Sequence, residues 1–186
     1  MSVLVLVLVS IAFIFYSLYI LLIRKKNKVK EASSGIDVQL KKRCDTIPNL
    51  LQTAAKFMTH EKELMQEITQ LRTEALSKSF SSTPQQAMQV ENELSAKLRA
   101  FNVSVENYPD LKSNQTMLQA MNALSEAEES IAAARRFYNS AVNDLNNAVE
   151  IFPSSFIAKY LHIQPAVFFE ATASEKEAIH VKDYLP

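Results

Sequence analysis

The spacing of hydrophobic positions along this chain changes once, near residue 24. Residues 3–23 are apolar almost without interruption and carry no charge. An uncharged run of about 20 residues is long enough to cross the roughly 30 Å hydrocarbon core of a bilayer as a helix. A helix also satisfies its own backbone hydrogen bonds in lipid. The pattern therefore predicts a transmembrane helix over residues 1–23.

Beyond residue 35, apolar residues recur every three or four positions, which is the period of an amphipathic helix. Three such stripes cover residues 36–75, 87–105 and 117–152. In the third stripe, apolar positions are spaced alternately four and three residues apart over about five heptads, which is the pattern of coiled-coil-like bundles. We call this line of positions the seam of the helix. Three long helices with short connections pack as antiparallel neighbours. We therefore expect an all-α fold, in which the membrane helix is followed by an antiparallel up-and-down bundle of three long helices plus a short fourth helix after Pro153.

Two places leave the course of the first bundle helix open. Pro48 lacks a backbone N–H, so it either kinks one helix or opens a new one at its first turn. Residues 33–35 read Ser-Ser-Gly. They are compatible with a continuous but bendable helix and equally with a short hinge. The apolar period also slips once near His60.

These patterns predict four parts of the chain. A transmembrane anchor (1–23) is followed by a basic juxtamembrane segment (24–35), the helical bundle (36–165) and a C-terminal tail (166–186). We expect Phe168 and Phe169 to dock on the bundle.

Positive charge marks the inner end of the apolar run. Positions 24–30 contain no acid and five of the 20 basic residues, namely Arg24, Lys25, Lys26, Lys28 and Lys30. Because such residues stay on the cytoplasmic side, we expect the N-terminus outside and the bundle in the cytosol, at the cytoplasmic (inner) membrane. Attraction of anionic lipid is a second, lesser role for this cluster. The competing interpretation, a cleaved signal peptide, requires positive charge before a shorter apolar stretch.

The remaining composition is that of a helical domain with an ordinary surface. Residues 31–186 hold 15 basic and 20 acidic side chains. They therefore lack the excess of positive charge that is typical of a nucleic-acid-binding surface. One glycine in 186 residues argues against hairpins and sheets, which need glycine at their turns. Cys44 is the single cysteine, and its place on an apolar stripe predicts a buried, inert thiol.

Two charged residues interrupt the seam of the third helix. Glu128 and Arg135 occupy positions that should be apolar, and an unpaired buried charge costs several kcal/mol. The first bundle helix offers Arg43, Asp45 and Asn49 as partners. We expect an interhelical polar layer, in which Arg135 meets Asp45 and Glu128 meets Arg43 or a neighbouring donor. Its expected role is to fix helix register, and the alternative is a binding or switch site.

Signals for catalysis are weak. A fragment of the HExxH zinc motif begins at His60 but lacks the second histidine. Three histidines and one cysteine show no metal-ligand spacing, and no glycine-rich loop is present to hold phosphate. A catalytic carboxylate pair among Asp37, Asp45 and Glu128 is a minor alternative. We therefore assign no catalytic, metal or cofactor-binding residue and expect the protein not to be an enzyme.

Four segments, in order along the chain, resemble the LemA family. They are GIDVQLKKRCDTIPNL (35–50), YPDLKSN (108–114), EESIAAARRFYN (128–139) and FPSSFIA (152–158). The resemblance implies a short N-terminal membrane anchor and a small up-and-down helical bundle. It implies no particular reaction.

Two classes of function remain. The favoured one is a membrane-anchored scaffold, adaptor or oligomerising element at the cytoplasmic membrane. The alternative is a ligand-sensing or enzymatic bundle that uses the polar layer as its site. Expected partners are the lipid bilayer and either a membrane protein or a second copy of the chain, and no cofactor or nucleic acid is expected.

Overall fold

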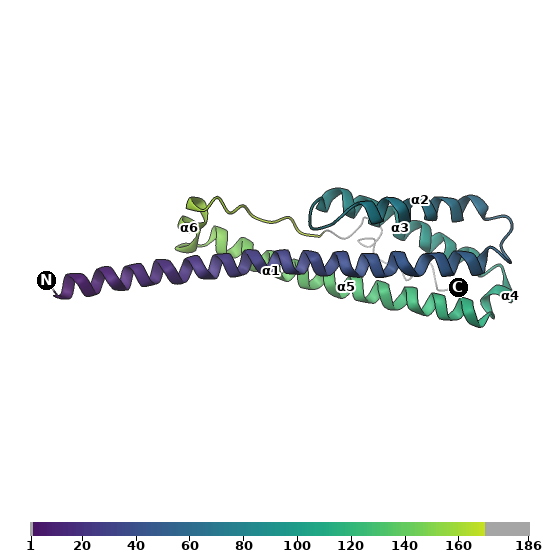
Figure 1. The fold of residues 1–186 in the computed structure, drawn as a ribbon, viewed down its shortest axis with the longest axis horizontal. Coiled ribbons are helices and arrows are strands. Elements are labelled where there is room, and N and C mark those ends of the chain that lie inside the picture. The colour runs from purple at the N-terminus through teal and green to yellow at the C-terminus, as the bar shows by residue number, and fades with distance from the viewer. Residues whose placement is uncertain (1, 170–186) are drawn as a thin grey trace, which may run out of the picture.

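The structure, a computed structural model, describes residues 2–169, and every regular element in that range is a helix, as predicted. The elements are α1 (Ser2–Ala54), α2 (Lys62–Ser77), α3 (Pro84–Val105), α4 (Pro109–Lys112), α5 (Gln115–Glu150) and α6 (Ser154–Tyr160) (Figure 1). The short helix expected after Pro153 is α6.

Four helices alternate in direction to form the bundle. The second half of α1 is followed by α2, α3 and α5 in up-down-up-down order, with turns at both ends (Figure 1). The sequence predicted three long helices, and that count is wrong. The chain leaves helix at residues 55–61 and turns back, so the first expected bundle helix is divided between α1 and α2. This break falls where the apolar period slips near His60.

The apolar run and the bundle share one uninterrupted helix. α1 has 53 residues, so it is about 80 Å long at 1.5 Å per residue, and its first part extends beyond the bundle (Figure 1). Gly35 lies inside this helix, and a Cβ added there would meet nothing within 4 Å. Of the two arrangements that the sequence left open, the structure has the continuous helix and not the hinge.

Pro48 lies in the interior of α1 and removes one of its hydrogen bonds. In a regular helix, residue 48 would donate its N–H to the carbonyl of Cys44, four residues earlier. Nε of Arg72, on α2, donates to this Cys44 carbonyl instead, at 2.6 Å. The carbonyl that proline leaves without its helical donor is therefore satisfied by a neighbouring helix, and α1 continues through Pro48 to Ala54.

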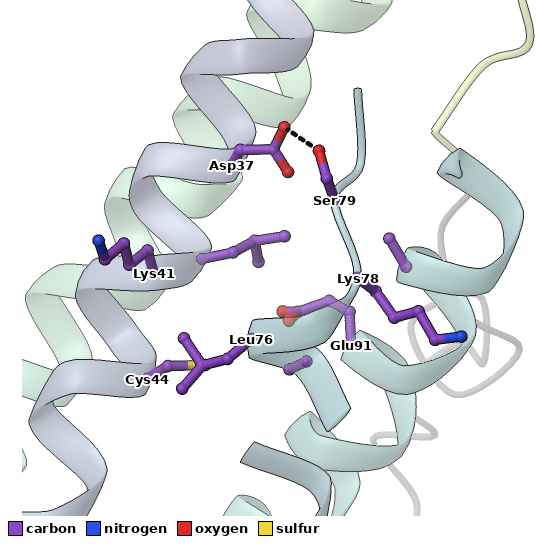
Figure 2. Close-up of a pocket in the computed structure, with 10 residues that line it drawn as sticks. Asp37, Lys41, Cys44, Leu76, Lys78, Ser79 and Glu91 are labelled. Carbon is purple, nitrogen blue, oxygen red and sulfur yellow. Dashed lines mark hydrogen bonds between the residues drawn. The ribbon is translucent and has the colours of Figure 1, made fainter. Parts of the chain in front are cut away.

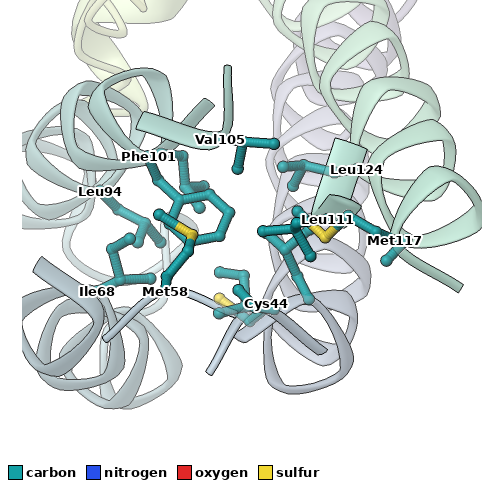
Figure 3. Close-up of a cluster of buried hydrophobic side chains, with 14 residues drawn as sticks. Cys44, Met58, Ile68, Leu94, Phe101, Val105, Leu111, Met117 and Leu124 are labelled. Atoms are coloured by element: carbon teal, nitrogen blue, oxygen red, sulfur yellow. The ribbon is translucent and has the colours of Figure 1, made fainter. Parts of the chain in front are cut away.

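The apolar core of the described residues forms three clusters along the bundle. The largest, at the end far from the N-terminus, joins α1, α2, α3 and α5 around Phe101 and Leu124 (Figure 3). The middle cluster contains Phe80, Tyr138 and Phe169. The third joins α1, α5 and α6 where α1 leaves the bundle.

One of the two phenylalanines of the predicted tail docks as expected. The ring of Phe169 is buried and stacks on Phe80 with 5.2 Å between centroids. Phe168 is exposed instead. Asn139 holds the backbone of residue 169 through two hydrogen bonds of 2.8 and 2.9 Å, so this segment lies along α5. Residues 170–186 of the tail lie outside the described residues.

The Pro48–Arg72 relation is testable with a double-mutant cycle. Arg72→Met leaves the buried Cys44 carbonyl without a donor, which should lower the free energy of unfolding by about 1–3 kcal/mol. In a Pro48→Ala background, residue 48 has an N–H that reaches the same carbonyl, so Arg72→Met should cost less. Urea unfolding of the full chain in detergent, followed by circular dichroism, measures both costs. An equal loss of unfolding free energy on Arg72→Met in the Pro48 and the Pro48→Ala backgrounds would contradict this account.

Candidate functional site

A buried carboxylate on α3 connects three helices near the middle of the bundle. Oε2 of Glu91 accepts a hydrogen bond from Nη2 of Arg43 on α1 at 2.6 Å. Its Oε1 accepts from Nη2 of Arg135 on α5 at 3.2 Å. Ser95, one turn further along α3, accepts from Nη1 of Arg43 at 2.9 Å. We call Arg43, Glu91, Ser95 and Arg135 the polar cluster.

The helical period places each charge of this cluster among core residues. Arg43 lies three residues after Leu40 and four before Ile47 on the inner side of α1, and Arg135 lies between Ile131 and Tyr138 on α5. Both arginines therefore point toward α3.

The sequence-based prediction missed Glu91. It is four residues after Ala87 and three before Leu94, so it occupies a seam position of its helix like the two arginines. Val90, the residue before it, is apolar and continues the hydrophobic stripe of residues 87–105. The charge at Glu91 therefore does not interrupt the apolar pattern of this helix. A count of charged residues at seam positions in every helix, and not in the third alone, would have found it.

The structure separates the five residues of the predicted polar layer. Arg43 and Arg135 belong to the polar cluster, whereas Glu128 lies beside it with an exposed side chain. Asp45 and Asn49 are exposed and line a different groove, between α1 and α5. Arg135 thus meets Glu91 and not Asp45, because Asp45 lies about 200° around α1 from Arg43.

Burial and charge act in opposite directions on Glu91. Its exposed fraction is 2%, and burial raises the pKa of the carboxyl, while the guanidinium groups of Arg43 and Arg135 oppose that rise. Charge-assisted hydrogen bonds on both oxygens stabilise the ionised form. The cluster then contains two positive charges and one negative charge. Nε of Arg43 is buried and has no hydrogen-bond partner among the described residues.

A cavity of ≈ 400 Å³ lies on one side of Glu91, between α1, α2 and α3 (Figure 2). Cys44 and Lys41 line it from α1, and Leu76 lines it from α2. Burial raises the pKa of the Cys44 thiol, which is therefore protonated at neutral pH. The thiol is buried, as predicted.

Asp37, at the rim of this cavity, holds the loop between α2 and α3. Its carboxylate accepts a hydrogen bond from the hydroxyl of Ser79 at 2.9 Å (Figure 2). It also accepts from the backbone N–H groups of Phe80 and Ser81 at 2.6 and 3.1 Å. A carboxylate engaged in three hydrogen bonds has a clear structural role. Asp37 thus fastens residues 79–81 to α1.

A smaller cavity of ≈ 160 Å³ lies on the other side of Glu91. It is lined by the polar cluster together with Arg99, Glu128, Ile131 and Ala132. Its charged lining consists of three arginines and two glutamates, so it favours a small anionic or polar molecule. This cavity, together with the polar cluster, is the candidate binding site.

The three carboxylates of the minor catalytic alternative do not converge. Asp37 binds the loop between α2 and α3, Asp45 lines the groove between α1 and α5, and Glu128 borders the small cavity. Within residues 2–169, no group of three or more His, Cys, Asp and Glu side chains is arranged to hold a metal ion. The arrangement is suited to fixing helices against one another and to admitting a small polar molecule.

Neutralising Glu91 should destabilise the bundle strongly. Glu91→Gln removes the buried negative charge that faces the buried Arg43 and the partly exposed Arg135, which should lower the free energy of unfolding by about 3–5 kcal/mol. Glu93→Gln is the matched control, because Glu93 is exposed two residues further along α3. Urea unfolding of both full-length variants in detergent provides the comparison. Similar midpoints for the two variants would show that the ion pairs do not hold the bundle.

Comparisons with known proteins agree with this architecture. The sequence model of the LemA family matches residues 32–182, a range that contains the whole polar cluster and both cavities. Protein LemA of Metamycoplasma hominis is 26% identical over 167 residues, which cover 88% of this chain and 75% of that protein. The chain belongs to the LemA family.

Proposed function

We propose that this protein is a single-pass, membrane-anchored helical bundle that acts as a scaffold, adaptor or oligomerising element at the cytoplasmic membrane, without catalytic activity. The observation that carries this proposal is the continuity of α1, which includes both the apolar run and the first helix of the bundle. Among the described residues, α1 is the helix long and apolar enough to cross a bilayer. Every side chain from Val3 to Val9 is more than half exposed, so none of the residues 2–169 that the structure describes covers this surface.

The basic residues after the span support an orientation with the bundle in the cytosol. Arg24, Lys26, Lys28 and Lys30 are exposed around α1, where they are available to lipid headgroups. Lys25 is half-buried, with its Nζ 4.0 Å from a carboxylate oxygen of Asp144 on α5. Since no acid interrupts positions 24–30, the positive-inside rule applies to this segment directly.

Confinement of a rigid bundle to a membrane favours lateral association. A molecule restricted to one surface meets its neighbours at a high effective concentration, so weak contacts between sides of the bundle suffice. Because α1 passes from the span into the bundle without a hinge, each side of the bundle stays at one height above the lipid. Exposed apolar side chains such as Leu118 on α5 and Val103 on α3 offer contact points.

In-membrane photocrosslinking tests this function. A photoreactive amino acid in place of Leu118, on the exposed side of α5, should form a discrete adduct with a membrane protein or with a second copy of the chain. The same substitution at Val103, on α3, tests a different side of the bundle. Only uncrosslinked monomer at both positions, in native membranes, would contradict an interaction role.

The small cavity beside the polar cluster favours a second candidate, a ligand-sensing bundle. A small anion would be attracted by Arg43, Arg99 and Arg135, which outnumber the two glutamates in the cavity wall. Such binding needs no movement of the helices, since the cavity is already present.

Thermal unfolding with added acetate or inorganic phosphate, at constant ionic strength, tests this second function. Binding at 100 times the Kd should stabilise the folded chain by about 2.7 kcal/mol. Arg99→Gln should abolish the shift while leaving the fold intact, because Arg99 is exposed. An unfolding temperature equal to that in chloride would exclude a site for these anions.

A further inference from the structure

Exposed apolar side chains gather at the turn between α5 and α6. Phe152, Phe156 and Tyr160 are 81%, 68% and 82% exposed, and Ile151 is 60% exposed. We call these four residues the aromatic tip. Apolar surface costs about 25 cal/mol per Å² when it faces water, and a concentration of it marks an interaction surface.

The aromatic tip lies beside the inner end of the apolar run of α1. Leu22 of α1 is fully buried in a cluster with Ile157 and Ala158 of α6, and Leu18 packs on the same cluster. Figure 1 shows α6 at the level where α1 leaves the bundle. The tip is therefore beside residues 18–23, just before the basic segment begins.

The end of the apolar run places the membrane surface at this level. Residues 2–23 carry no charge, and the first charged side chain is that of Arg24. Charged side chains stay outside the hydrocarbon core, so that core ends near residue 23 and covers residues 18–21, the part of α1 that α6 flanks. A bilayer that covers this stretch also reaches α6.

We propose that the aromatic tip inserts into the cytoplasmic leaflet, at the boundary between headgroups and acyl chains, so that the protein holds the membrane at two places. Tyrosine is enriched at this depth, and the apolar faces of interfacial helices, which carry Phe and Leu, enter it by about 5–10 Å. Lys159, exposed between Phe156 and Tyr160, faces anionic headgroups, and the charge of Glu150 stays in the aqueous layer. This inference rests on the proposed anchoring of α1 in the membrane.

Insertion of the tip has a consequence for the whole bundle. A single helix crossing a bilayer leaves the bundle free to tilt with respect to the membrane. A second attachment beside that helix limits the tilt, while the fluid leaflet still permits rotation about the membrane normal. The end of the bundle that carries α6 then stays at the lipid surface, and the opposite end, with α4, points into the cytosol (Figure 1).

Fluorescence quenching by brominated lipid tests the proposal in the full chain. The sequence has no tryptophan, so one introduced residue is the only indole reporter. Phe156→Trp, in vesicles of phosphatidylcholine and phosphatidylglycerol, should lose emission with lipids brominated near the headgroup and lose less with lipids brominated near the bilayer centre. Val103→Trp is the matched control, because Val103 is 70% exposed at the far end of α3, and it should lose no emission.

A third variant separates this inference from the anchoring proposal. Phe13→Trp, in the middle of the apolar run, should be quenched by deep bromines if α1 spans the bilayer. Quenching of Phe13→Trp without quenching of Phe156→Trp would overturn the tip insertion and leave the anchor in place. Absence of quenching in both Phe13→Trp and Phe156→Trp would overturn the anchor as well. A blue-shifted Phe156→Trp emission that no brominated lipid quenches would show that protein, and not lipid, covers the tip.

Discussion

One helix, α1, supplies the surface to which the other described helices of the bundle are attached. α5 packs along the part of α1 that lies in the bundle, and α6 joins α1 through the cluster around Leu22. Polar contacts add to this packing on the side of α2 and α3. Asp37 holds the loop between them, Arg43 holds α3 through Glu91, and the carbonyl of Cys44 holds α2 through Arg72. These contacts are spaced along α1, so a bend in this helix would move its partners apart.

The polar contacts explain how helices with similar apolar stripes settle in one register. Apolar seams tolerate sliding by a turn, because one Leu or Ala replaces another at modest cost. A buried carboxylate between two guanidinium groups tolerates no such slip, since displacement by one turn leaves charges unpaired in the core. Replacement of a buried ion pair by apolar residues often leaves stability unchanged. The polar cluster therefore contributes more to the choice of one arrangement than to the total free energy.

The proposed attachment of α1 to a membrane gives this rigidity a use. The bundle begins within the same helix that is expected to cross the bilayer, and α6 places apolar rings beside that helix. A bundle held in this way has a defined orientation as well as a defined location. The proposed role as a scaffold or adaptor would benefit from both, because partners on the same membrane would then meet the same surface each time.

The sequence by itself determined the features that depend on local period and length. It predicted the all-helical class, the long apolar helix with its step in charge, the short helix after Pro153 and a polar layer that includes Arg43 and Arg135. Only the tertiary structure decided the break at residues 55–61, the passage of α1 through Gly35 and Pro48, and the choice of Glu91 in place of Asp45 as the partner of Arg135. The reason is physical. Periodicity tells which side of a helix is buried, but the angle at which two helices meet decides which polar groups come within hydrogen-bonding distance. That angle follows from contacts between residues far apart in the chain.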